Sequence, residues 1–119
     1  MDGLILKPKW ARLIATGAKT LEIRGHRMHK FLEPFYILES GTGRAIGIAE
    51  CEGNIPIPNG ETWEHYKNEH LVDLPFAELP YKKVFGWRIQ NAMPVEPFRY
   101  EHPRGAVIWV KDVDARRIE

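Results

Sequence analysis

Three charged side chains fall within six residues near the amino terminus, in a segment that is otherwise apolar. These are Lys19, Glu22 and Arg24, and the apolar residues Leu21 and Ile23 alternate with the last two. Such alternation is typical of a half-buried β-strand, on which Glu22 and Arg24 share one face. A lysine beside a carboxylate can move protons, and an arginine can hold that carboxylate in place. The residue types and their spacing therefore suit acid–base chemistry.

The charges alone leave two interpretations open. Glu22 and Arg24 form a structural ion pair at the rim of a sheet, or they line a polar pocket together with Lys19. Lys19 leaves the chain from a turn, because Gly17 is expected to end the preceding helix. The surrounding elements decide between the two interpretations.

The pattern of the whole chain predicts an α+β fold, a small mixed β-barrel of five to six strands with two helices. One helix places Trp10, Leu13 and Ile14 on one face, and a second helix spans Trp63 to His70. We expect a single domain covering residues 1–119, with a proline-containing loop at 55–60 and an irregular extended segment at 93–100. The predicted strands cover residues 3–7, 19–24, 35–40, 44–51, 83–90 and 106–110.

Composition narrows the class of protein. The chain has 119 residues, of which 44% are apolar and 28% charged, as in a globular protein with its own core. No apolar run approaches the roughly 18 residues that a membrane span needs. The amino terminus lacks the features of a secretory signal, and a single cysteine, Cys51, excludes an internal disulfide. We therefore expect a cytoplasmic protein with no membrane partner.

Charge is unevenly distributed although the net charge is only +1. Residues 1–32 carry seven basic and two acidic side chains, whereas residues 33–80 carry two basic and nine acidic ones. Basic ends around an acidic middle suit a pocket that receives a polar or anionic ligand at one rim. They do not suit a protein coated for non-specific DNA binding.

Beyond these patterns, the segment Gly17-x-Lys19-x-x-Glu22-x-Arg24 resembles the signature of the ASCH domain, a family of PUA-like barrels associated with RNA. The resemblance covers nearly the whole chain. It extends to four further patterns that resemble the paired and closing strands of that family: Ile37-x-x-Ser40, Gly43-x-x-x-Gly47, Lys83-x-x-x-Trp87-x-Ile89 and Gly105-x-x-x-Trp109.

The resemblance implies a polar pocket of the size of a nucleobase. Some small members of the family are amidohydrolases that remove the acyl group from N4-acetylcytidine, and others bind or cleave RNA. In the amidohydrolases the position of Lys19 holds a base or activator, and the position of Glu22 holds a threonine proposed as the nucleophile. A glutamate from the later helical region completes that site. Glu69 is the rough match here, with Glu61 and Glu64 as alternatives.

Glu22 in place of the threonine changes the expected chemistry. The simplest hypothesis is a water molecule activated by Glu22, with Lys19 donating to the carbonyl oxygen or to the leaving nitrogen. Lys19 and Glu22 can also exchange these roles. Arg24 would hold Glu22 in a bidentate pair, and Thr20 is a poor substitute for the missing nucleophile.

Other side chains are candidates for contact with a ligand. Trp63 and Tyr66 would stack on a base or form the core-facing stripe of their helix, and Ser40 would donate a hydrogen bond. The five histidines do not show metal-ligand spacing, so we predict no metal, and nothing in the sequence calls for a cofactor.

Three functions follow in order of preference. The first is hydrolysis of an N4-acylated cytosine nucleoside, with a nucleoside or modified base as the small-molecule partner. The second is a non-catalytic module that binds RNA or a modified base, in which the basic first third contacts phosphates. The third is cleavage of RNA, with Lys19 as the base.

Overall fold

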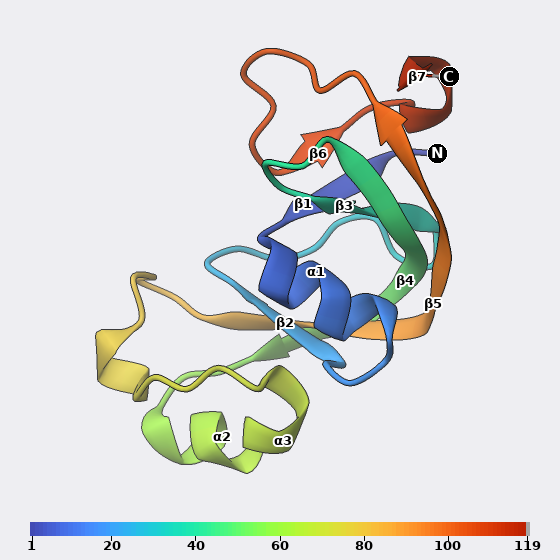
Figure 1. Ribbon diagram of the computed structural model, residues 1–119. Coiled ribbons are helices and arrows are strands. Elements are labelled where there is room, and N and C mark those ends of the chain that lie inside the picture. Colours follow the sequence, from blue (N-terminus) through green and yellow to red (C-terminus); the bar gives the residue numbers. More distant parts are fainter. Residues whose placement is uncertain (119) are drawn as a thin grey trace.

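The computed structural model describes residues 1–118, in which one strongly curled sheet wraps around a helix (Figure 1). Its strands run in the spatial order β2-β5-β4-β3-β1-β6, and β7 pairs with the end of β5. The β1–β3 pair is parallel and the other pairs are antiparallel. The predicted α+β class with a small mixed barrel is confirmed. The strands are β1 Gly3–Leu6, β2 Leu21–Arg24, β3 Phe35–Glu39, β4 Arg44–Pro56, β5 Phe85–Tyr100, β6 Trp109–Val110 and β7 Arg117–Ile118.

Helix α1 (Pro8–Ala15) lies across the hollow side of the sheet and places the turn that carries Lys19. The helix begins at a proline, whose missing N–H needs no partner there, and Gly17 turns the chain with a φ of +85°. Gly47 of β4 allows close packing, because a Cβ there would lie 3.0 Å from the Ala15 Cβ. That Cβ would also lie 3.0 Å from the Met93 carbonyl oxygen, where the β4–β5 register shifts between Ala45 and Gly47.

Strands β4 and β5 form a long bent hairpin that runs the length of the molecule (Figure 1). The sequence predicted two separate segments where β5 is continuous. Pro94 and Pro97 fit within it because β2 pairs only with residues 85–88 and β7 only with residues 99–100. Among the described strands, the stretch between them has β4 as its one neighbour, so its other edge needs no N–H donors.

The loop between β4 and β5 holds a small helical lobe below the sheet, made of α2 (Gly60–His65), α3 (Lys67–His70) and the 3-10 helix η1 (Phe76–Glu78). Asn59 caps α2 by accepting a hydrogen bond from the Thr62 backbone N–H at 2.9 Å. The sequence predicted one helix here, but the chain leaves helical geometry at Tyr66. The lobe packs on β2 and so forms one wall of the site described below.

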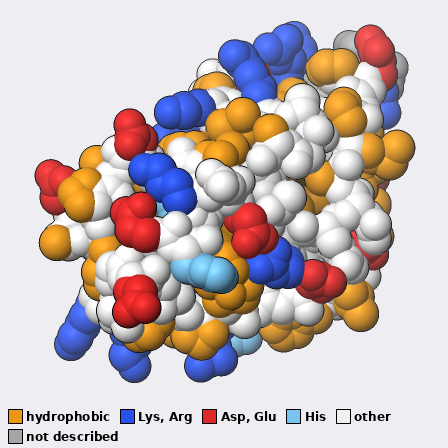
Figure 2. Space-filling model, turned by 90° about the horizontal axis from the view of Figure 1, so that it is seen from below, with side chains coloured by type: hydrophobic (Ala, Val, Ile, Leu, Met, Phe, Trp, Pro, Cys, Tyr) orange, Lys and Arg blue, Asp and Glu red, His pale blue; other side chains and the backbone are white. Residues whose placement is uncertain are grey.

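Figure 2 shows acidic and basic side chains interspersed over the lower face of the molecule. No helix in residues 1–118 is long and apolar enough to cross a membrane.

Candidate active site

Strand β2 and the turn before it bring Lys19, Glu22 and Arg24 together. Glu22 and Arg24 lie on the same face of β2, as strand alternation predicted, and their side chains meet. The turn is anchored by a hydrogen bond of 2.9 Å from the Lys19 backbone N–H to the Leu13 carbonyl of α1. The charged segment therefore has a fixed backbone on both sides of Lys19.

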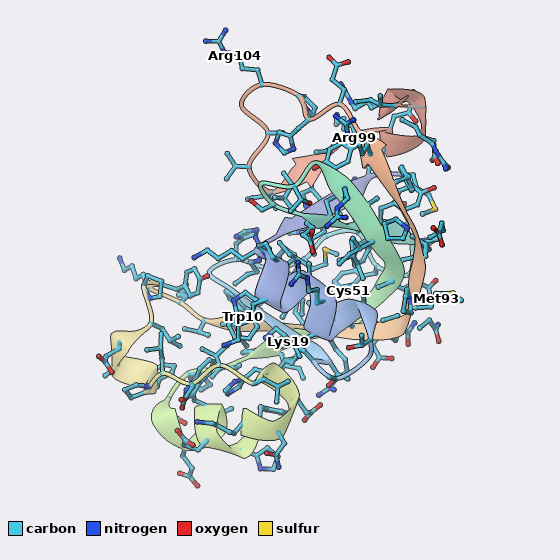
Figure 3. All side chains as sticks on the ribbon, in the orientation of Figure 1. Trp10, Lys19, Cys51, Met93, Arg99 and Arg104 are labelled. Atoms are coloured by element: carbon cyan, nitrogen blue, oxygen red, sulfur yellow. The ribbon has the colours of Figure 1, made fainter. Side chains whose placement is uncertain are left out.

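Lys19 is buried, with only 1% of its surface exposed. Its ammonium group donates to the backbone carbonyl of His70, lies 3.8 Å from Glu22 Oε1 and sits 4.6 Å from the centre of the Trp10 ring. Figure 3 shows Trp10 and Lys19 side by side between α1 and the helical lobe. Burial lowers the pKa of Lys19 to about 8, an effect that the Glu22 carboxylate partly opposes and the Arg24 guanidinium adds to. Lys19 is thus a buried amine whose pKa lies well below that of an exposed lysine.

Glu22 lies between two cations and is only 6% exposed. Its Oε2 accepts a hydrogen bond of 2.9 Å from Arg24 Nε, while its Oε1 faces Lys19. The predicted bidentate pair is wrong, because Arg24 Nη2 donates instead to the Ile5 carbonyl of β1 at 3.1 Å. The guanidinium also lies 5.2 Å from the centre of the Trp87 ring. Arg24 thereby links the Glu22 carboxylate on β2 to β1, a strand that is not paired with β2 in the sheet.

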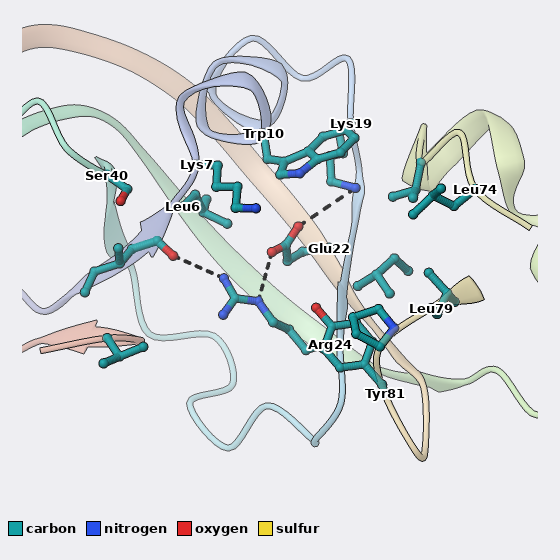
Figure 4. Close-up of a pocket in the computed structure, with 15 residues that line it drawn as sticks. Leu6, Lys7, Trp10, Lys19, Glu22, Arg24, Ser40, Leu74, Leu79 and Tyr81 are labelled. Atoms are coloured by element: carbon teal, nitrogen blue, oxygen red, sulfur yellow. Dashed lines mark hydrogen bonds and ion pairs between the residues drawn. The ribbon is translucent and has the colours of Figure 1, made fainter. Parts of the chain in front are cut away.

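These three side chains line a cleft of about 550 Å³ between α1, β2 and the helical lobe (Figure 4). This volume is in the range of small-molecule sites. The far wall is apolar and comes from the loop after α3 and from the segment before β5. The other lining residues are Ile5, Leu6, Lys7, Trp10, Ile23, Ser40, Val72, Leu74, Leu79, Pro80, Tyr81 and Val107.

Of the remaining predicted site residues, only Ser40 lines the cleft. It lies just beyond the end of β3, away from Lys19 and Glu22 in the close-up (Figure 4). Its backbone N–H donates to the Leu6 carbonyl at 2.8 Å. Ser40 therefore suits contact with a distal part of a ligand better than contact with the reacting atoms.

The aromatic residues of the helical lobe lie outside the cleft lining. Trp63 is fully buried in the core and donates a hydrogen bond of 2.8 Å to the Leu74 carbonyl. Tyr66 packs against the same core, and its ring centre lies 6.0 Å from the Arg88 guanidinium. Trp63 and Tyr66 therefore face the core, which was one of the two interpretations of their spacing.

Thr20 and Glu69 also lie outside the cleft lining. The Thr20 backbone N–H donates to the Glu69 carbonyl at 3.1 Å, so the two residues join β2 to α3. The Glu69 carboxylate pairs with Arg88 Nη1 at 2.5 Å. Glu69 thus connects the helical lobe to the sheet through its backbone and its side chain.

Several lining residues were missed by the sequence analysis. The sequence predicted only that Trp10 shares a helix face with Leu13 and Ile14, yet Trp10 covers Lys19. The contact of the His70 carbonyl with Lys19 has no signal in the sequence. Leu74, Leu79 and Tyr81 come from irregular segments, in which no periodicity marks a shared face. In the part of the chain that the structure describes, no group of three metal-ligating side chains comes together.

A curled mixed sheet of this size, wrapped around one helix and with a cleft at its edge that is charged on one side, defines a small PUA-like barrel. The profile of the ASCH domain family matches residues 4–104, so the chain belongs to the ASCH domain family. This family is linked to RNA binding or hydrolysis.

Solved structures agree with this assignment of the fold. The ASCH protein from Zymomonas mobilis is similar with a TM-score of 0.72 at 17% identity, over 97% of this chain and 91% of that one. Two variants of that protein, one with a tyrosine changed to phenylalanine and one with a serine changed to alanine, give the same TM-score at 18% identity. They cover 96% of this chain and 92% and 90% of theirs. A search of curated proteins found no match.

Proposed function

We propose that this protein is an amidohydrolase that acts on N4-acylated cytosine nucleosides such as N4-acetylcytidine. The observation that carries the proposal is the convergence of Lys19, Glu22 and Arg24 on one cleft of nucleoside size. Two cations and one carboxylate at the edge of an apolar cleft are suited to an uncharged ligand with several acceptors and one donor.

The exposed edge of an N4-acylcytosine has this pattern. The acyl oxygen, the ring N3 and the ring O2 accept hydrogen bonds, and N4–H donates one. Glu22 would accept from N4–H, while Lys19 and Arg24 would donate to the acyl and ring acceptors. Leu74, Leu79 and the Tyr81 ring supply apolar surface for the base or the acyl chain.

Hydrolysis requires attack by water on the acyl carbon and cleavage of the bond from that carbon to N4. Glu22 takes a proton from the attacking water while the oxygen of that water bonds to the acyl carbon. The Lys19 ammonium stabilises the negative charge that develops on the acyl oxygen. When the bond to N4 breaks, N4 receives a proton from Lys19 or from the Glu22 carboxyl. The products are the cytosine nucleoside and a carboxylic acid.

Water is the preferred nucleophile because neither candidate aliphatic hydroxyl, Ser40 or Thr20, is placed beside this pair. Ser40 and Tyr81 bring hydroxyl groups to the cleft, but Ser40 lies at its far end and Thr20 is outside its lining. The single, buried Cys51 fits a proposed cytoplasmic location and plays no part in the site.

A second candidate is a module that binds a modified base without turnover. One observation favours it: each oxygen of Glu22 already faces a cation, Oε1 towards Lys19 and Oε2 towards Arg24. A carboxylate held in this way suits the recognition of an N–H group on a base as well as it suits proton transfer.

A panel of three ligands separates these functions. We would incubate the full chain with N4-acetylcytidine, cytidine and single-stranded RNA, and follow each by chromatography and by NMR shifts. Conversion of N4-acetylcytidine to cytidine with release of acetate supports the amidohydrolase. Shifts of cleft residues without conversion support the binding module, and shortened RNA supports a nuclease. Mass spectrometry of acetate formed in ¹⁸O-labelled water, together with the absence of an acylated protein, tests the role of water as nucleophile.

A further inference from the structure

The imidazole of His70, at the end of α3, is fully buried and has both ring nitrogens engaged. Its Nδ1 lies 2.9 Å from the backbone N of Val72, and its Nε2 lies 2.9 Å from the carbonyl oxygen of Trp63. A backbone N–H can only donate, so Nδ1 must accept. The proton of the ring therefore lies on Nε2, which donates to Trp63. These two partners define one neutral tautomer.

Packing holds the same ring in place. The His70 ring stacks on the Trp63 indole, with centres 3.7 Å apart and planes 15° from parallel. The indole is itself fixed by its hydrogen bond to the Leu74 carbonyl. Burial lowers the pKa of His70, which agrees with the neutral form required by its hydrogen bonds. The side chain thus joins α2, α3 and the loop that forms the far wall of the cleft.

The backbone of His70 serves the site directly. Its carbonyl is at the carboxyl end of α3, where helical carbonyls lack partners within the helix, and it accepts a hydrogen bond from Lys19 Nζ. Leu71 then turns the chain with a φ of +58°, a conformation that a non-glycine residue rarely adopts. The hydrogen bond from the Val72 N–H back to the His70 ring closes this turn.

We propose that His70 is a positioning residue for Lys19: its neutral ring clamps the turn after α3 and so fixes the carbonyl that holds the ammonium group at the cleft. Only the expected effect of His70 on turnover rests on the proposed function of Lys19. An apolar ring of the same size would fill the space, but it would leave the Val72 N–H and the Trp63 carbonyl without their partners. The carbonyl of residue 70 would then no longer be held against Lys19.

Three substitutions separate the clamp from simple packing. His70→Phe keeps an aromatic ring against Trp63 and removes both hydrogen bonds. His70→Asn keeps an acceptor near the position of Nδ1 for the Val72 N–H, and His70→Gln keeps a donor near the position of Nε2 for the Trp63 carbonyl. Cooperative unfolding followed by circular dichroism identifies the variants that fold.

The readout is the pKa of Lys19 in the full chain, measured by NMR of ¹³C- and ¹⁵N-labelled lysine and assigned with Lys19→Met. Burial is the main cause of the lowered pKa, and loosening the turn admits water. Loss of the carbonyl acceptor disfavours the ammonium and entry of water favours it, so in His70→Phe we expect this pKa to move away from about 8 by about one pH unit or more, and in His70→Asn to stay within about 0.3 of the wild type. If His70→Phe does not fold, His70→Gln is measured in its place and is expected to shift likewise.

An unchanged Lys19 pKa in folded His70→Phe, or in folded His70→Gln where the former is unfolded, would overturn the proposal. A shift as large in His70→Asn as in His70→Phe would also overturn it. These measurements need no turnover, so they remain decisive if N4-acetylcytidine is not a substrate. If it is a substrate, His70→Phe should lower kcat about tenfold or more with KM nearly unchanged, and His70→Asn should restore most of kcat.

Discussion

The Lys19 ammonium lies 3.8 Å from Glu22 Oε1, and the two side chains are 1% and 7% exposed. A buried ion pair contributes little to stability by itself, since its attraction must first offset the loss of hydration of both charges. Arg24 adds a second cation at 2.9 Å from the other oxygen of Glu22. The arrangement concentrates three charges where the cleft meets β2, and Lys19 and Glu22 have distinct measurable consequences.

Stability should depend on pH through Lys19. Its pKa is lowered to about 8 in the folded chain, so the unfolded chain, with a lysine pKa of about 10.4, binds more protons between these values. Stability contributed at this site therefore rises as the pH increases from about 8 to about 10. We would measure the free energy of unfolding in urea at pH 7.5 and at pH 9.5. Between these two pH values it should rise by about 2 kcal/mol more in the wild type than in Lys19→Met.

The comparison with Lys19→Met is needed because other groups titrate in the same range. Burial raises the pKa values of the Cys51 thiol and of the Tyr100 hydroxyl, and these groups destabilise the folded chain as the pH rises. They are present in both proteins and cancel in the difference. Equal pH dependence of the two proteins would contradict the burial of a charged Lys19.

Replacing Glu22 with glutamine should be strongly destabilising. The change leaves the Lys19 and Arg24 cations facing each other in a buried place without their shared anion, which typically costs about 3–5 kcal/mol. It should also lower the pKa of Lys19 further, since the Glu22 charge opposes the effect of burial. Denaturant unfolding and lysine NMR measure these effects. Glu64→Gln, on the exposed side of α2, serves as the control and should change neither quantity.

Much of this fold follows from patterns that can be seen in the chain. Alternation around Leu21 and Ile23 defined β2, and Gly17 marked the end of α1. The strand β5 was less predictable, because prolines normally interrupt a strand and its open edge depends on where β2 and β7 end. The charged side of the site was predictable for the same reason as β2. Its other wall comes from irregular loop segments, which only the folded chain brings to the cleft.

Glu69 illustrates the limit of positional matching. The family resemblance suggested Glu69 as the acid from the helical lobe, and the structure places it outside the cleft lining. The Glu69 carboxylate pairs with Arg88 at 2.5 Å, and the Glu69 backbone holds β2. Such a contact depends on tertiary packing, which periodicity cannot specify.

Glu69→Gln should accordingly have little effect. Its ion pair with Arg88 is partly exposed, and such pairs usually contribute less than about 1 kcal/mol. We expect unfolding to change by less than that amount and turnover of N4-acetylcytidine to stay within about twofold of the wild type. A large loss of kcat with unchanged stability would place this carboxylate in the reaction. Arg88→Gln breaks the same ion pair from the other side and should behave alike.

The proposed hydrolysis depends most directly on Lys19, for which the chain offers a matched control. Lys9 also contacts the Trp10 ring, with its ammonium 4.8 Å from the ring centre, but Lys9 is exposed and is not among the cleft-lining residues. Lys19→Met leaves Glu22 paired with Arg24 and is expected to fold. The decisive measurement is the rate of acetate release from N4-acetylcytidine by the wild type, Lys19→Met and Lys9→Met. We predict turnover by the wild type and by Lys9→Met, and a loss of at least about 100-fold in Lys19→Met. Equal rates in the wild type and folded Lys19→Met, or no acetate release by the wild type, would contradict the account.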